Sequence, residues 1–155
     1  KVKTTLLRPD EIDIGGIIDG LIYKNSQGKK IKISTNYIKR LRFTDLQNKE
    51  RIFYNDGTKT LNELMYQGKI RWYRTFSTSA YDGHLVIYDC FENEHYERTC
   101  ASFYLGIKAK LKEITRRSRP DLEEFIDRMK MEHDIIIFIL KKYDEEVPVD
   151  IEDTE

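Results

Sequence analysis

The chain has 155 residues, of which 39% are hydrophobic and 35% charged, and its 27 Lys/Arg are balanced by 27 Asp/Glu. This length fits one domain, and the composition is typical of a folded chain and excludes an intrinsically disordered one. The longest continuous apolar run, Ile135 to Leu140, is far shorter than the roughly 20 residues of a membrane-spanning helix, so we expect no membrane partner.

The charges are unevenly distributed along the chain. Residues 1–88 carry 16 Lys/Arg and 9 Asp/Glu, whereas residues 89–155 carry 11 and 18. Residues 144–155 are strongly acidic, and we expect them to form a flexible, solvated tail. No linker-like segment interrupts the rest, so residues 1–143 are predicted to form a single β-rich domain with C-terminal helices.

Turn-forming residues divide the first two-thirds of the chain into short segments that are rich in β-branched and aromatic residues. Leucine and methionine at helical spacing predict one helical turn over Leu61–Tyr66. Several short strands at this spacing are typical of a small antiparallel barrel or a strongly bent sheet of about six to seven strands. The predicted strands cover residues 17–24, 29–35, 38–44, 50–54, 69–77, 84–91 and 96–104.

The last third of the chain changes to a helical period. Apolar residues three and four apart predict a helix over residues 104–117. Pro120 and Asp121 are typical of the start of a second helix, with proline in its first turn and an acid near the positive end of its dipole. The run Ile135–Leu140 fits either the continuation of this helix, which we favour, or a buried strand. The predicted fold class is therefore α+β, a barrel or bent sheet followed by two C-terminal helices.

Three of the predicted strands alternate basic and apolar residues. Because successive side chains of a strand point to opposite faces, the apolar residues are predicted to share one core and the basic ones to share the opposite face, which also bears tyrosines. The predicted core residues are Ile31, Ile33, Leu41, Phe43, Ile70 and Trp72. The candidate ligand-binding residues are Lys30, Lys32, Tyr37, Arg40, Arg42, Tyr54, Lys69, Arg71 and Tyr73.

A basic face with tyrosines predicts a non-catalytic module that binds an anionic partner. Lys and Arg hold phosphates while aromatic rings stack on bases, so single-stranded nucleic acid is the best candidate. A merely solvated sheet has the same charge pattern, which leaves open a protein–protein interaction subunit of a larger assembly. Such a subunit would bind a partner, or self-associate, through the C-terminal apolar segment at Ile135, Phe138 and Ile139.

The sequence lacks the common catalytic and phosphate-binding motifs, and we expect neither enzymatic activity nor a cofactor. A small enzyme built around Asp82 and His84 is a third alternative. However, an acid and an imidazole this close in sequence are more typical of a turn than of a catalytic pair.

Cys90, His95 and Cys100 are the residues with metal-like spacing, but no fourth zinc ligand is evident, so we expect no metal. The two cysteines fit a zinc site, a disulfide across a predicted hairpin, or ordinary packing, and we expect ordinary packing. Two cysteines and no Asn-x-Ser/Thr acceptor favour an intracellular protein, without distinguishing cytoplasm from nucleus. No diagnostic set of residues assigns the chain to a known family.

Overall fold

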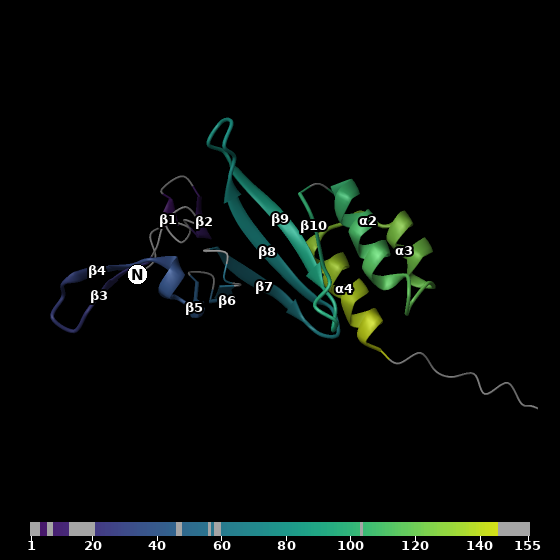
Figure 1. Ribbon diagram of the computed structural model, residues 1–155, viewed down its shortest axis with the longest axis horizontal. Helices are drawn as coiled ribbons and strands as arrows, with labels where there is room; N and C mark the ends of the chain where they lie inside the picture. The colour runs from purple at the N-terminus through teal and green to yellow at the C-terminus, as the bar shows by residue number, and fades with distance from the viewer. Residues whose placement is uncertain are drawn as a thin grey trace, which may run out of the picture.

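A computed structural model describes residues 4–5, 8–12, 21–45, 48–55, 57, 60–102 and 104–145. Its centre is a six-stranded antiparallel sheet in the order β10-β9-β8-β7-β6-β5 (Figure 1). Among the described residues, the outer strands β5 and β10 do not pair with each other, so the sheet is bent and open rather than a closed barrel. Its strands are β5 (Arg40–Thr44), β6 (Glu50–Asn55), β7 (Leu61–Gln67), β8 (Arg71–Thr78), β9 (Leu85–Glu92) and β10 (Arg98–Ala101).

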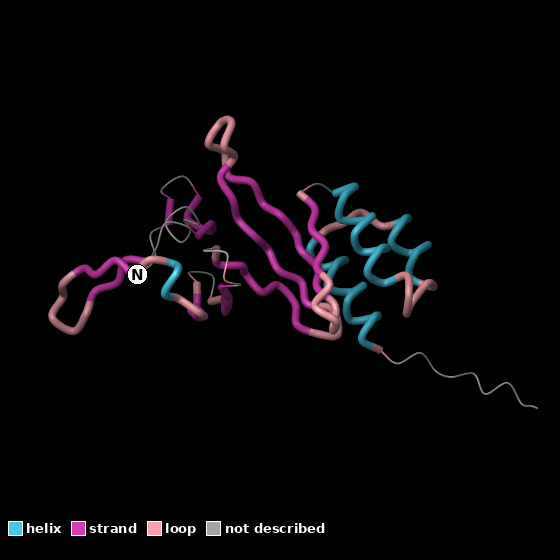
Figure 2. The backbone as a smooth tube through the Cα atoms, viewed as in Figure 1, coloured by secondary structure: helices cyan, strands magenta, loops and turns pink. Residues whose placement is uncertain are grey.

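Two smaller antiparallel pairs precede this sheet in the chain. β1 (Thr4–Thr5) pairs with β2 (Arg8–Ile12), and β3 (Leu21–Lys24) pairs with β4 (Lys30–Ile33). The 3-10 helix η1 (Thr35–Tyr37) lies between β4 and β5 in the chain. The β3–β4 hairpin and the tip of the β8–β9 hairpin both extend away from the main body (Figure 2). Residues 17–20 of the first predicted strand lie outside the described residues.

Three C-terminal helices follow the sheet, α2 (Tyr104–Thr115), α3 (Leu122–Arg128) and α4 (His133–Asp144), and the prediction of two was wrong. The backbone adopts an extended conformation at Met129, the C-cap residue of α3. Met131, in the interruption between α3 and α4, is buried in the main core. The helical alternative for residues 135–140 is confirmed, because they lie inside α4. No helix in the described part of the chain is long and apolar enough to cross a membrane.

The helices cover one face of the sheet at its β8–β10 end, and we call this face the helix face (Figure 1). Trp72 of β8 and Phe91 of β9 are register partners whose rings stack on this face, with centroids 6.2 Å apart. Both are fully buried against residues of the three helices, such as Leu111, Ile126 and Ile139. This cluster is the main hydrophobic core.

A second, smaller cluster lies on the same face at the β5–β7 end of the sheet. Leu41 and Phe43 pack there against Phe53, Leu61 and Phe76. The prediction of one shared core was therefore wrong. Of the six predicted residues, Ile70 and Trp72 lie under the helices, Leu41 and Phe43 lie in the second cluster, and Ile31 and Ile33 are half-buried in the separate β3–β4 hairpin. The predicted alternation is nevertheless present, since Lys30, Lys32, Arg40 and Arg42 are exposed between less exposed apolar neighbours.

The predicted helical turn over Leu61–Tyr66 was wrong, because this segment is strand β7. The reason is its buried polar residues: Asn62 and Glu63 are 2% and 3% exposed and interrupt the apolar alternation that marks a strand. Distant strands supply their partners. Arg51 of β6 donates to Glu63 at 2.8 Å, and Thr75 of β8 donates to Asn62. A register shift between Leu64 and Tyr66 also interrupts the two-residue alternation by which a strand is recognised in the sequence.

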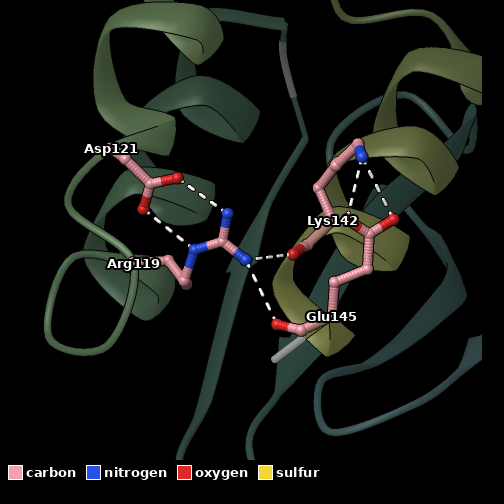
Figure 3. A network of polar contacts seen from close by, with 4 residues as sticks. All are labelled: Arg119, Asp121, Lys142 and Glu145. Atoms are coloured by element: carbon pink, nitrogen blue, oxygen red, sulfur yellow. Dashed lines mark hydrogen bonds and ion pairs between the residues drawn. The ribbon is translucent and has the colours of Figure 1, made fainter. Parts of the chain in front are cut away.

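The C-terminal end of α4 is fixed by side chains from two directions. Arg119 forms a bidentate pair with Asp121 at 2.9 and 2.7 Å and donates to the backbone carbonyls of Lys142 and Glu145 (Figure 3). These carbonyls belong to the unsatisfied acceptors at the end of a helix. The hydrogen bonds and charge of Asp121 raise the pKa of Arg119 further, so this cap stays charged.

From the other side, Asp144 accepts hydrogen bonds from the Tyr66 hydroxyl at 2.5 Å and from the Lys69 backbone N–H at 2.9 Å. A side chain at Gly68 would place its Cβ 2.0 Å from the Asp144 carboxylate, so a larger residue at this turn would displace Asp144 from this contact. Asp144 and Glu145, the first residues of the predicted acidic tail, thus belong to the folded part of the chain. Residues 146–155 lie outside the described residues.

Candidate functional site

The face of the sheet opposite the helices, which we call the distal face, contains a hollow of about 330 Å³. Register places Tyr54, Asn62, Tyr73 and Arg98 on this face, since they alternate with the residues of the helix face along β6, β7, β8 and β10. The hollow is lined by Tyr54, Asn55, Asn62, Leu64, Gln67, Arg71, Tyr73, Glu92 and Arg98. Residues up to 44 positions apart in sequence therefore meet in one concave site.

Arg98 has a central position in this hollow. Its guanidinium lies over the ring of Tyr73, 5.6 Å from the centroid, and donates to Thr75 at 3.1 Å and to Asn62 Oδ1 at 3.3 Å. Thr75 also donates to Asn62 Oδ1. Two donors on the same oxygen fix the orientation of the buried Asn62 amide beneath the hollow.

The second arginine of the hollow, Arg71, forms an ion pair with Glu92, the one carboxylate among the lining residues. Arg71 and Glu92 are register partners on β8 and β9, and their side chains lie 2.5 Å apart. The Arg71 guanidinium also lies 5.1 Å from the centroid of the Tyr96 ring. Two arginines and one glutamate give the lining a net charge of one positive unit, and this favours a singly charged anion.

Tyr73 is held as a neutral ring at the base of the site. Burial is the largest cause that raises its pKa above the ordinary value, and the charge of Glu92 acts in the same direction. Arg71 and Arg98 oppose this shift but do not reverse it. At physiological pH the phenol therefore keeps its proton and presents an uncharged aromatic surface.

At the β5–β6 side of the distal face, Arg40 lies over the ring of Tyr54, 5.3 Å from its centroid. The two are register partners on adjacent strands. Arginine–tyrosine pairs thus border both sides of the hollow, Arg40 with Tyr54 and Arg98 with Tyr73. Each pair combines a positive charge with a planar surface, the two features that hold a phosphate and a base.

The structure brings together four of the nine predicted ligand residues, namely Arg40, Tyr54, Arg71 and Tyr73. Arg42 shares the distal face but pairs with Glu50 at 2.6 Å. The remaining residues lie apart from the hollow: Lys30 and Lys32 on the β3–β4 hairpin, Tyr37 in η1, and Lys69 in the turn before β8.

Arg98, Asn62 and Glu92 are site residues that the sequence analysis missed. Neither Arg98 nor Glu92 is among the predicted ligand residues, and the structure shows that they are register partners in β9–β10. The sequence signal that could have placed Arg98 is its position two residues before Cys100 on the same strand. Residues two apart on a strand share a face, so the face of one predicts the face of the other.

Cys90 and Cys100 form a disulfide, and the expectation of ordinary packing was wrong. They are register partners with Cα atoms 4.1 Å apart, the close approach of a non-hydrogen-bonded antiparallel pair. Among the described residues, no group of three or more His, Cys, Asp or Glu is arranged to hold a metal ion. Disulfides persist mainly in oxidising compartments, so this bond removes one premise of the intracellular expectation.

Asp82 and His84 lie in the exposed turn between β8 and β9. The Asp82 carboxylate accepts from the backbone N–H of His84 at 3.1 Å, which is a turn-forming contact. A hydrogen bond from the Ser79 side chain is the main cause that lowers the pKa of Asp82. These contacts explain why Asp82 and His84 lie close together, because both belong to the turn.

The predicted partner-binding residues of α4 have different environments. Ile139 is fully buried and Ile135 packs against the main core, whereas Phe138 is 43% exposed. The Phe138 ring lies 5.4 Å from that of Phe125. Ile135 and Ile139 thus contribute their apolar side chains to the protein's own main core.

Comparison with known proteins identifies no relative: no protein-family model, no curated protein and no solved structure matches the chain.

Proposed function

We propose that this chain is a non-catalytic binding module whose distal face binds single-stranded nucleic acid. The observation that carries the proposal is the convergence of Arg71, Arg98 and Tyr73 on one hollow, with Arg40 and Tyr54 at its border. Arginine guanidinium groups contact phosphates whatever the sequence, and tyrosine rings stack on bases. A nucleic-acid strand carries both phosphates and bases.

Three features of the hollow favour a single strand over a duplex or a free polyphosphate. Its volume of about 330 Å³ is near the lower end of the roughly 300–1,000 Å³ of ligand pockets, which suits one nucleotide unit. Its one net positive charge matches one phosphodiester group. Stacking on Tyr73 further requires a base that is not enclosed in a duplex.

A side-chain amide and a carboxylate of the lining supply polar contacts to a base held there. Gln67 is exposed and lines the hollow, so its amide offers both a donor and an acceptor, and Glu92 offers carboxylate oxygens as acceptors. Together they can accept and donate hydrogen bonds along the edge of an unpaired base, as single-strand-binding modules do. We therefore propose that the hollow holds one base and that neighbouring nucleotides lie along the distal face.

The test is the binding of fluorescently labelled oligonucleotides, measured by fluorescence anisotropy at low salt. We expect single-stranded oligonucleotides to bind more tightly than a duplex of the same sequence, and base-free dextran sulfate to compete poorly with them. Absence of oligonucleotide binding at low salt, where the electrostatic contribution is largest, would contradict the proposal. Equal competition by dextran sulfate would reduce it to nonspecific polyanion binding.

A further inference from the structure

The Cys90–Cys100 disulfide belongs to the same face as the hollow. Cys90 is the register partner of Tyr73 in β8–β9, and Cys100 lies two residues after Arg98 on β10. Cys90 Sγ also lies 3.7 Å from the hydroxyl of Thr75, to which Arg98 donates. The disulfide thus adjoins the polar contacts that hold Arg98 over the site.

Strand β10 depends on this bond more than the other strands of the sheet do. It has four residues, it lies at the edge, and among described strands it pairs with β9 alone. Short edge strands open at lower free energy than strands paired on both sides. The disulfide is the covalent tie that closes β10 onto β9, and Arg98 is the residue that β10 contributes to the hollow.

We propose that the Cys90–Cys100 disulfide is a redox latch that holds Arg98 in the binding site, so that thiol reduction weakens ligand binding. This inference rests on the proposed function. Cys100 is exposed whereas Cys90 is 2% exposed, so the accessible sulfur is that of Cys100. An ordinary structural disulfide would stabilise the hairpin without changing affinity.

The reductant is a dithiol. One of its thiolates attacks Sγ of Cys100, the Cys90–Cys100 bond breaks, and the Cys90 thiolate leaves and takes up a proton. The second thiol of the reductant, as its thiolate, then attacks its own sulfur in the mixed disulfide and displaces Cys100, which is protonated in turn. Two electrons pass to the protein, which ends with two thiols, and the reductant ends as a disulfide.

The test compares oxidised and dithiothreitol-reduced protein in the same oligonucleotide titration, with thiol counts verifying both states. We expect the reduced protein to bind about tenfold more weakly, equivalent to about 1.4 kcal/mol. Arg98→Ala should bind equally weakly when oxidised, and its reduction should cause no further loss, because both changes remove the same contact. Cys100→Ser should reproduce the reduced protein. Amide hydrogen exchange should rise in β10 on reduction while α4 stays protected.

Equal affinity of oxidised and reduced wild type would overturn the latch and leave the proposed function intact. Global unfolding on reduction, seen by circular dichroism, would also overturn it, because the bond would then be simply structural. Absence of binding in the oxidised state would instead overturn the proposed function, and the latch with it.

Discussion

The guanidinium of Arg98 lies over the ring of Tyr73, 5.6 Å from its centroid, and this contact joins an edge strand to the centre of the distal face. Arg98 also donates to Thr75 and Asn62, so its position is set by β7 and β8 as well as by its own strand. The hollow is therefore a product of the sheet as a whole. Its role in binding and the stability of the fold can therefore be tested separately by substitution.

Replacement of Tyr73 with alanine tests the stacking role of the ring. If the ring stacks on a base, Tyr73→Ala should weaken oligonucleotide binding by about 1–3 kcal/mol. Tyr73→Phe keeps the ring and should retain nearly all of the affinity. Tyr81→Ala is the matched control, since Tyr81 lies in the β8–β9 turn and is 98% exposed. Equal affinity of Tyr73→Ala and wild type in anisotropy titrations would exclude stacking on this ring.

Replacement of Arg119 tests the cap at the end of α4. Arg119→Ala leaves Asp121 and two helix-end carbonyls without this donor, and we expect a loss of about 1.5–3 kcal/mol in the free energy of unfolding. The measurement is urea denaturation followed by circular dichroism. Arg117→Ala removes an exposed arginine from the same turn and should change stability by less than about 0.5 kcal/mol. Similar effects of the two substitutions would contradict the assigned role.

The environment of His133 predicts that the free energy of unfolding decreases in acid. Burial is the main cause that lowers its pKa, and the charges of Lys49 and Arg74 add to the effect against the opposing charges of Asp134 and Asp89. The unfolded state therefore binds a proton at a pH where the folded state does not. Stability attributable to this group is present above the unfolded pKa of about 6.5 and decreases as pH falls below it.

The check is urea denaturation of wild type and His133→Gln between pH 7.5 and pH 5. We expect the advantage of the wild type over His133→Gln to shrink as pH falls, because glutamine does not titrate. His84→Gln, in the exposed β8–β9 turn, is the control and should follow the wild-type profile. A wild-type advantage that stays constant or grows in acid would contradict the prediction.

The sequence predicts those elements in which local pattern and tertiary environment agree. The alternation of Arg40, Leu41, Arg42 and Phe43 identified β5 and its exposed basic side correctly, because each side chain faces the environment that its chemistry favours. The helical period likewise identified α2 over Tyr104–Thr115.

The sequence fails where a distant partner decides the structure. Asn62 is buried in β7 because Thr75 and Arg98 satisfy its amide oxygen, and no local pattern contains that information. The break between α3 and α4 contains the buried residue Met131, although the apolar period of its neighbours predicts a continuous helix. Arg98 joins the site only once the register of β9 and β10 is known.

The most direct test of the central claim is the salt dependence of oligonucleotide affinity for wild type and for the double variant Arg71→Ala/Arg98→Ala. Each phosphate contact contributes about 0.7 to the steepness of the slope of log affinity against log salt for single strands, so loss of the one phosphodiester contact in the hollow should reduce the steepness by about 0.7. Arg116→Ala/Arg117→Ala removes the same charge from the exposed α2–α3 turn and should keep the wild-type slope. A double variant of the hollow with wild-type affinity and slope would show that the distal face does not bind the strand.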